Sequence, residues 1–189
     1  MPPSVPTATE VYVIEALDTA RHHRDGFSCG VSAVENFFRP TAGKLSKAGN
    51  IRVYVMTDPT GTVVGFHALN AHSIDYADLP SPFARTRPSH GSIPAAFISM
   101  MGRDSRFRGS KLGEDLLVDA LLRIERLAAT IGITVVILDV LDCGDPRKVA
   151  NRLPLYQSFG FEPLASSPLR LFLPIKNIRA TLDSLDVPD

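Results

Sequence analysis

The stretch RFRGSKLGEDLL, residues 106–117, places basic side chains around two glycines where an amphipathic helix pattern begins. The first turn of a helix leaves backbone N–H groups unpaired and carries partial positive charge, so it can bind an anion. Gly109 lets a ligand approach the backbone closely, and Arg108 and Lys111 add Coulomb attraction. A site for a phosphate-bearing ligand is therefore the functional interpretation of this stretch. Short glycine patterns also occur by chance, so the local pattern alone slightly favours the alternative, in which the glycines serve helix packing and the basic side chains only contact solvent.

Tyr156, in the sequence LYQSFGF, is a second candidate for chemistry. Acyl transfer from a thioester to an amine must expel a thiolate, and a phenol at hydrogen-bond distance can protonate or stabilise it. A tyrosine beside aromatic residues is otherwise most often a packing residue. The residues alone favour packing and leave catalysis open.

No residue stands out as the base that would keep an attacking amine neutral. His67 and His72, in the segment GFHALNAHSI, are candidates, although a lone histidine is more often structural. Asp139 and Asp142 end a predicted strand, where carboxylates often satisfy backbone groups.

The segments around these residues predict one mixed sheet. Runs rich in β-branched, aromatic and apolar residues predict strands at 10–17, 51–57, 62–71, 94–104, 133–141, 160–164 and 169–175. The second and third should form a hairpin, because the residues between them, Asp-Pro-Thr-Gly at 58–61, favour a turn. The run at 133–141 is continuously apolar, which is typical of a strand buried on both faces. Residues 79–93, rich in Pro, Ser and Gly, should form the longest irregular connection.

The first predicted helix has recognisable signals at both ends. Ser32 precedes Glu35 by three residues, the spacing of a capping box, so a helix should start at Ser32. Pro40 should stop or kink it, and a second short helix should follow as far as Gly49.

A long helix is predicted over residues 112–128, where leucine, isoleucine and alanine recur at helical spacing. Gly132 should be its C-terminal glycine. The segment 145–159 has a helical pattern except for Pro154. Strands and helices in this order predict a single mixed α/β domain around one sheet.

The length and composition fit one globular domain. With 189 residues, 44% of them hydrophobic and 21% charged, the chain can bury a full core. We expect a flexible N-terminus at 1–9, the domain at 10–178 and a C-terminal tail at 179–189. Twenty basic and twenty acidic side chains cancel, so no overall charge attracts nucleic acid or an anionic membrane.

Other sequence features predict a cytoplasmic protein without metal or membrane. No apolar run is long enough to span a bilayer, and the N-terminal residues lack the features of a signal peptide. Cys29 and Cys143 lie far apart and match neither a metal-ligand spacing nor a disulfide framework. A reduced cytosol is the simplest compartment.

The segment 21–52 is locally basic. Its charged residues are Arg21, Arg24, Arg39, Lys44, Lys47 and Arg52 against Asp25 and Glu35. Any one such residue most often contacts only solvent. Together with His22 and His23, the run is also a candidate surface for the phosphates of a nucleic acid.

The segment RFRGSKLGEDLL, preceded by FISMMGRD and followed by VVILDVL and LYQSFGFEPL, resembles the GNAT superfamily of acyl-CoA-dependent N-acetyltransferases. The resemblance implies a mixed, mostly antiparallel sheet flanked by helices, direct transfer from acetyl-CoA, and no metal. In that family the motif Gln/Arg-x-x-Gly-x-Gly/Ala binds the pyrophosphate of coenzyme A. It falls here on Arg108, Gly109, Ser110, Lys111, Leu112 and Gly113, with Lys111 in place of a glycine. The preceding strand, at Met101, Gly102 and Arg103, is implied to present backbone groups to the pantetheine arm.

Further motifs resemble one branch, the acetyltransferase toxins of bacterial type II toxin–antitoxin systems. They are FSCGVSAVENFF, GFHALNAHSI, DVLD, LYQSFGFEPL and RLFLPIKNI, and the similarity covers residues 10–178. The resemblance implies that Tyr156 is catalytic and that the acceptor is the α-amine of an aminoacyl-tRNA. It also implies a ribbon-helix-helix antitoxin and a homodimer. The stretch between Asp142 and Tyr156 is longer here than in the branch.

Two other functions stay compatible with the sequence. One is a GNAT enzyme that acetylates a small amine or a protein N-terminus. The other is a GNAT fold that binds an acyl-CoA or a partner without catalysis, which Lys111 and Pro154 would fit. Turnover of acetyl-CoA would exclude the second, and a ribbon-helix-helix gene immediately upstream would favour the toxin over the first.

Overall fold

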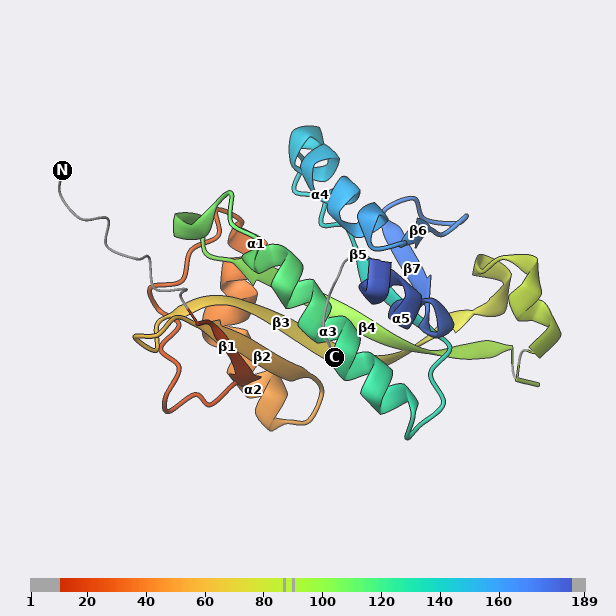
Figure 1. The fold of residues 1–189 in the computed structure, drawn as a ribbon, viewed down its shortest axis with the longest axis horizontal. Coiled ribbons are helices and arrows are strands. Elements are labelled where there is room, and N and C mark those ends of the chain that lie inside the picture. Colours follow the sequence, from red (N-terminus) through yellow and green to blue (C-terminus); the bar gives the residue numbers. More distant parts are fainter. Residues whose placement is uncertain (1–10, 87, 90, 185–189) are drawn as a thin grey trace.

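The computed structural model describes residues 11–86, 88–89 and 91–184, and it contains one seven-stranded sheet (Figure 1). The strands are β1 Val13–Ala16, β2 Arg52–Thr57, β3 Val63–Asp75, β4 Ser92–Arg103, β5 Val135–Asp139, β6 Glu162–Pro163 and β7 Arg170–Pro174. Their order is β1-β2-β3-β4-β5-β7-β6, and all neighbours are antiparallel except β4 and β5. The predicted mixed, mostly antiparallel sheet and the β2–β3 hairpin are confirmed.

Helices cover both faces of the sheet (Figure 1). They are α1 Ser32–Asn36, α2 Ala42–Lys47, α3 Leu112–Ala128, α4 Pro146–Ser158 and α5 Ile175–Ser184, with short turns η1 Phe37–Thr41, η2 Tyr76–Asp78, η3 Ser81–Thr86 and η4 Ser105–Phe107. Val34 and Phe38, from the segment α1 to α2, pack against Val55 and Phe66 of the sheet. Helices α3 and α5 form a second core on the opposite face.

The sheet opens between β4 and β5. The two strands pair only as far as Ile98 and Leu138, although β4 continues to Arg103. An extra residue in β4, Ser99, shifts its register against β3, and a bulge of this kind bends the strand. Because β5 ends at Asp139, the remainder of β4 has no neighbouring strand on that side. This gap positions the site described below.

Helix α3 has the predicted bounds, but its predicted C-terminal glycine is wrong. The helix ends at Ala128, and its C-cap is Ala129 in the ordinary right-handed conformation. The N–H of Ile131 donates to Leu127 O at 3.0 Å, so the last turn closes before Gly132 and needs no left-handed residue.

The capping box predicted at the start of α1 is also wrong. The helix begins at Ser32, but its N-cap is Val31, and no side chain caps it. Glu35 does not bond to the start of the helix, because its carboxylate accepts three hydrogen bonds from the loop 28–30. Pro40 lies inside the π-helical turn η1, which links α1 to α2 without a break.

The C-terminal part differs from the predictions at three points. Helix α4 passes through Pro154, which lies on its exposed side, where losing one backbone donor is tolerated. Helix α5 follows β7 directly and is not predicted by the patterns above. The boundary expected at residue 178 falls inside α5, where Ile178 and Leu182 are buried against α3. The expected flexible residues 1–9 and the last five residues of the chain lie outside the described part.

Candidate active site

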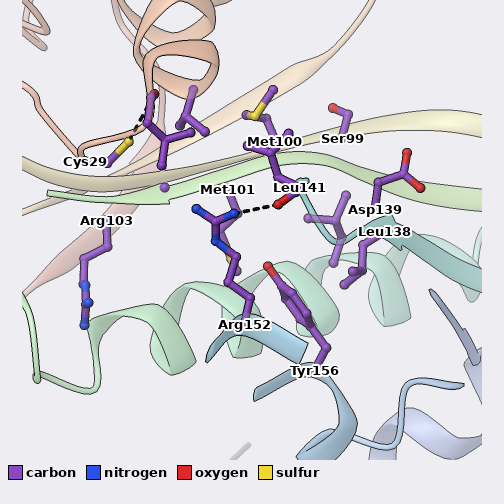
Figure 2. Close-up of a pocket in the computed structure, with 14 residues that line it drawn as sticks. Cys29, Ser99, Met100, Met101, Arg103, Leu138, Asp139, Leu141, Arg152 and Tyr156 are labelled. Carbon is purple, nitrogen blue, oxygen red and sulfur yellow. Dashed lines mark hydrogen bonds between the residues drawn. The ribbon is translucent and has the colours of Figure 1, made fainter. Parts of the chain in front are cut away.

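A groove lies between the start of α3, the open edge of β4 and helix α4. It consists of two adjoining cavities of about 590 and 360 Å³. The cavities share seven lining residues: Cys29, Val31, Met101, Gly102, Arg103, Arg152 and Tyr156. The larger cavity extends to Arg108 and Gly113 at the helix start. The smaller cavity, shown in Figure 2, extends to Ser99 and Leu138 in the strand gap. An extended ligand can therefore contact both the helix start and Tyr156.

The start of α3 presents backbone donors that no described residue uses. Among the described residues, no acceptor pairs with four of the N–H groups, those of Gly109, Lys111, Leu112 and Gly113. Gly109 has φ +83°, a left-handed conformation that favours glycine, and a Cβ there would meet no atom within 4 Å. Arg103 Nη1 donates to Ser110 O at 2.9 Å and holds the loop against β4. Unpaired N–H groups at a helix start are able to bind an anion.

Lys111, where the GNAT motif has a glycine, does not disturb this loop. Its φ of −76° and ψ of 0° lie in the right-handed region that any residue adopts, so no glycine is required. Its side chain is exposed and lines neither cavity. Leu112 also lies outside the groove, because its side chain is buried in the core beneath the helix start.

Of the nine residues predicted to bind the cofactor, six line the groove. Met101, Gly102 and Arg103 line both cavities, and Arg108, Ser110 and Gly113 line the larger one. Gly109, Lys111 and Leu112 line neither cavity.

Strand β4 offers a free edge to a ligand. Met101 and Gly102 pair with β3 on one side, and the strand has no partner past Ile98 on the other. A Cβ at Gly102 would lie 2.9 Å from Val34 Cγ1 and 3.0 Å from Phe66 Cε1, so close packing requires glycine here. An amide-rich chain can hydrogen-bond along this edge in the manner of one more strand.

Tyr156 lies on α4 and lines both cavities (Figure 2). Its ring packs edge-on against Phe161, with the ring centroids 6.3 Å apart. Its hydroxyl forms no hydrogen bond with any described residue, and Figure 2 shows it directed from α4 toward the strands. Burial raises the pKa of Tyr156, and the positive charge of Arg152 acts in the opposite direction. The side chain therefore presents a protonated, unused hydroxyl to the groove at neutral pH.

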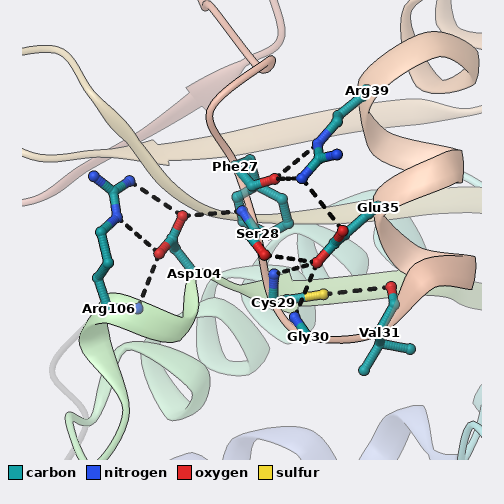
Figure 3. Close-up of polar contacts among 9 residues, drawn as sticks. All are labelled: Phe27, Ser28, Cys29, Gly30, Val31, Glu35, Arg39, Asp104 and Arg106. Carbon is teal, nitrogen blue, oxygen red and sulfur yellow. Dashed lines mark hydrogen bonds and ion pairs between the residues drawn. The ribbon is translucent and has the colours of Figure 1, made fainter.

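The wall of the groove opposite α4 is the loop 27–31, which Glu35 holds from α1 (Figure 3). One oxygen of this carboxylate accepts from Ser28 Oγ, Cys29 N and Gly30 N, each at 2.9 Å. The hydrogen bond from Ser28 and those from the backbone lower the pKa of Glu35. Arg39 donates to the other oxygen and to the carbonyl of Phe27, so it fastens the same loop.

Asp104, at the end of β4, holds the loop from the other side (Figure 3). This buried carboxylate accepts from Ser28 N at 3.2 Å and from Arg106 N and Nε, each at 2.9 Å. Burial opposes its ionisation, but these hydrogen bonds outweigh burial and lower the pKa of Asp104. Ser105 N also donates to Ser28 O at 2.7 Å. The groove wall and the loop before α3 are therefore one hydrogen-bonded unit.

His67 is not placed to act as a base. Its side chain is fully buried on β3 and lines neither cavity of the groove. Its Nε2 lies 2.6 Å from Asp119 Oδ2 on α3, and burial lowers the pKa of the imidazole in spite of that carboxylate. His67 therefore joins the sheet to α3.

The other candidate bases have different surroundings. His72 lines a third cavity of about 380 Å³ and neither cavity of the groove. Asp139 lines both this cavity and the smaller cavity of the groove, and it pairs with Arg170 through two hydrogen bonds of 2.7 Å. Asp142 accepts from Gly144 N and so stabilises a turn. Asp139 is thus the carboxylate at the junction of the two spaces.

Most of the basic run at 21–52 contacts the protein itself. Four of its side chains have intramolecular partners: Arg21 contacts Glu15, Arg24 the carbonyl of Phe38, Arg39 that of Phe27, and Arg52 that of Ser46. His22 is buried beside Glu15. Lys44 and Lys47 on α2 are exposed and have no hydrogen bond or ion pair with a described residue.

Two parts of the groove were not predicted from the sequence. Arg152 lies in the segment that is longer than in the resembled branch, and no local pattern distinguishes it from a solvated arginine. The loop 27–31 forms a wall only because Glu35 and Asp104 hold it. The motif FSCG was the one signal that this loop matters.

The described residues contain neither a membrane-spanning helix nor a metal-binding cluster. None of the described helices combines the length and apolar character that crossing a membrane requires. Within the same residues, no group of three or more His, Cys, Asp or Glu side chains could hold a metal ion.

Comparisons of the sequence found related toxins. The chain is 60% identical over 171 residues to a Sinorhizobium fredii protein named Probable toxin TacT, covering 90% of this chain and 94% of that protein. It is 31% identical over 156 residues to the tRNA-acetylating toxin of Mycobacterium tuberculosis, covering 82% of this chain and 88% of the toxin. No family model matches the chain.

Comparisons of the structure found the same fold. AtaT complexed with acetyl-methionyl-tRNAfMet superposes with a TM-score of 0.78 at 22% identity, over 90% of this chain and 98% of that one. AtaTR bound with AcCoA superposes with a TM-score of 0.74 at 24% identity, over 89% and 96%.

Proposed function

Because the chain belongs to the family of GNAT-fold acetyltransferase toxins, we propose that it transfers the acetyl group of acetyl-CoA to the α-amine of an aminoacyl-tRNA. One observation carries the proposal: a single groove joins the unused N–H groups at the start of α3 to the free hydroxyl of Tyr156. The names of the relatives indicate the class of acceptor. An acetylated α-amine can no longer form a peptide bond, so the reaction would block translation.

The donor lies along the groove in this proposal. Its pyrophosphate binds at the start of α3, where four N–H groups, Arg108 and the helix dipole supply positive charge. The pantetheine arm runs along the free edge of β4 at Met101 and Gly102. The thioester then lies in the strand gap beside Tyr156.

The reaction is a direct transfer. The neutral amine attacks the thioester carbonyl carbon, a C–N bond forms, and the carbonyl oxygen becomes an oxyanion. The C–S bond then breaks, its electron pair goes to sulfur, and the hydroxyl of Tyr156 protonates the thiolate. The proton lost by the amine nitrogen restores the phenol through solvent, so that acetyl-amine and free coenzyme A result.

Partners and location are part of the proposal. We propose a ribbon-helix-helix antitoxin, a homodimer and a cytoplasmic location. The toxin names of both relatives, and the structural similarity to an AtaT mutant toxin bound to the C-terminus of the antitoxin AtaR, support an antitoxin partner. The resemblance of the sequence motifs to the toxin branch supports the ribbon-helix-helix class of the antitoxin and the homodimer.

The function is tested with the full chain, labelled acetyl-CoA and charged tRNA. We expect label to move to aminoacyl-tRNA and not to uncharged tRNA. If the protein acetylates small amines or protein N-termini but does not acetylate charged tRNA, it is the alternative GNAT enzyme, which acts on a small amine or a protein N-terminus. Binding of acetyl-CoA without turnover on any acceptor would contradict catalysis.

The two free lysines of α2 give a prediction about tRNA binding. Replacing Lys44 and Lys47 together with Ala should weaken tRNA binding and lower the slope of log affinity against log salt by about 1–2, since each phosphate contact contributes about 0.7–0.9. Acetyl-CoA affinity should not change. Arg39 is left intact, because it holds the groove wall.

The matched control removes two exposed cations elsewhere, with Arg126→Ala and Lys176→Ala. Both proteins are titrated with tRNA across a salt series. Equal affinity and slope for the α2 variant and the wild type would exclude α2 as the docking surface.

A further inference from the structure

Arg152 lies in the groove beside Tyr156, and the direct transfer proposed for Tyr156 assigns it no role. It occupies α4 one helical turn before Tyr156, so the two side chains project from neighbouring positions on one face. Both line both cavities of the groove. Figure 2 shows the guanidinium between helix α4 and strand β4, near Met101 and Leu141.

Within the described part of the chain, the guanidinium has unused donors and no anionic partner. Its Nη1 donates to Leu141 O at 2.7 Å and lies 3.7 Å from Cys143 Sγ. No carboxylate among the described residues lies within 4.0 Å of it, and its Nε and Nη2 donate to none of those residues. A half-buried guanidinium normally pairs with an anion, because its removal from water is costly. A ligand that brings negative charge is the expected partner.

The position of Arg152 indicates which negative charge it meets. The smaller cavity contains Arg152, Tyr156, Ser99 and Leu138, and none of the phosphate-binding residues at the helix start. The helix start also has its own donors for the pyrophosphate. Asp139 also lines the smaller cavity, but its carboxylate is paired with Arg170. On the acetyl-thioester itself, negative charge appears only during the reaction, first on the carbonyl oxygen and then on the sulfur. A fixed cation there stabilises the transition state more than the ground state.

We propose that Arg152 is a second catalytic residue, which donates through Nε and Nη2 to the oxyanion and the departing thiolate of the acetyl-thioester. The backbone carbonyl of Leu141 orients the guanidinium by holding Nη1. This inference rests on the proposed function and adds no co-reactant, because the bonds made and broken are those of the direct transfer.

The electrostatics of Tyr156 agree with this geometry. The charge of Arg152 opposes the rise in the pKa of Tyr156 that burial causes. The other ionisable groups facing the same cavity are Cys29 from the groove wall, Arg103 from β4 and Asp139 from β5. Without Arg152 the phenol should be a weaker acid, and the alkaline limb of the kcat profile should move to higher pH.

The test compares Arg152→Gln and Arg152→Lys with Arg147→Gln, an exposed arginine on the same helix. Each protein is assayed with acetyl-CoA and with S-acetyl-pantetheine, a thioester without the pyrophosphate. We expect Arg152→Gln to lower kcat by about 10²-fold, in the range for loss of one oxyanion donor. Arg152→Gln should lower kcat/KM by the same factor with acetyl-CoA as with S-acetyl-pantetheine. Lys should restore part of the rate, and Arg147→Gln should match the wild type.

Three outcomes would overturn the assignment. A loss confined to acetyl-CoA would make Arg152 a phosphate ligand, and a loss confined to the KM for tRNA would make it a tRNA contact. An unchanged rate for Arg152→Gln beside an active wild type would remove any role. An inactive wild type in the same assay would instead contradict the proposed function. Melting curves of all variants identify any loss due to unfolding.

Discussion

Replacing Tyr156 with Phe is expected to lower the single-turnover rate of aminoacyl-tRNA acetylation by about 10²–10⁴-fold, the usual effect of losing a positioned general acid. The substitution keeps the ring and its edge-on contact with Phe161, so folding should change little. It also removes a hydroxyl that bonds to no described residue, so no buried partner is left unpaired. Affinity for acetyl-CoA should likewise stay within a few-fold. The rate is measured by rapid quench with labelled acetyl-CoA bound to the enzyme.

A second tyrosine supplies the control. Tyr54 lies on β2, lines neither cavity of the groove, and packs against Arg123 and His67. Tyr54→Phe should retain the wild-type rate. Because burial raises the pKa of Tyr156, the phenol stays protonated at neutral pH, and the loss in Tyr156→Phe should be the same from pH 6 to pH 8. A folded Tyr156→Phe protein within a few-fold of the wild-type rate would make Tyr156 a packing residue.

The second large effect is expected at Gly109. Gly109→Asp places a carboxylate beside the unused N–H groups where the pyrophosphate binds in our proposal. Repulsion between the two anions should weaken acetyl-CoA binding by about 10–100-fold, equivalent to roughly 1.4–2.8 kcal/mol. Calorimetric titration with acetyl-CoA measures this directly.

Gly109→Asn is the matched control, because its side chain has nearly the size of Asp without the charge. Both residues tolerate the left-handed conformation better than other side chains, and both enter space where a Cβ meets no atom within 4 Å. Asn should therefore weaken binding by no more than a few-fold. If Asp and Asn bind acetyl-CoA with equal, wild-type affinity, the pyrophosphate lies elsewhere.

Structural features that depend on neighbours in the chain were predictable. The helical spacing of the leucines in α3, the apolar run of β5 and the turn residues of the β2–β3 hairpin each act within a few residues. Helix ends were less predictable, because side chains that could cap a helix also have tertiary partners. Glu35 fits a capping box in sequence, but in the structure its carboxylate accepts hydrogen bonds from three donors of the loop 28–30 and does not cap the helix.

The sequence by itself determined the seven strands, the helices as far as α4, the basic glycine loop at the start of α3 and the candidate status of Tyr156, because each is a local pattern of residue types. Only the tertiary structure decided which distant residues meet. The groove wall at 27–31 faces α4 because Asp104 holds it across 76 positions of the chain. Arg152 faces the groove because α4 crosses the strand gap that the bulge at Ser99 helps to open. His67, a candidate base in the sequence, is buried beneath α3, where its imidazole pairs with Asp119. Contacts of this kind depend on how the sheet bends and where its strands part, and no local pattern encodes that.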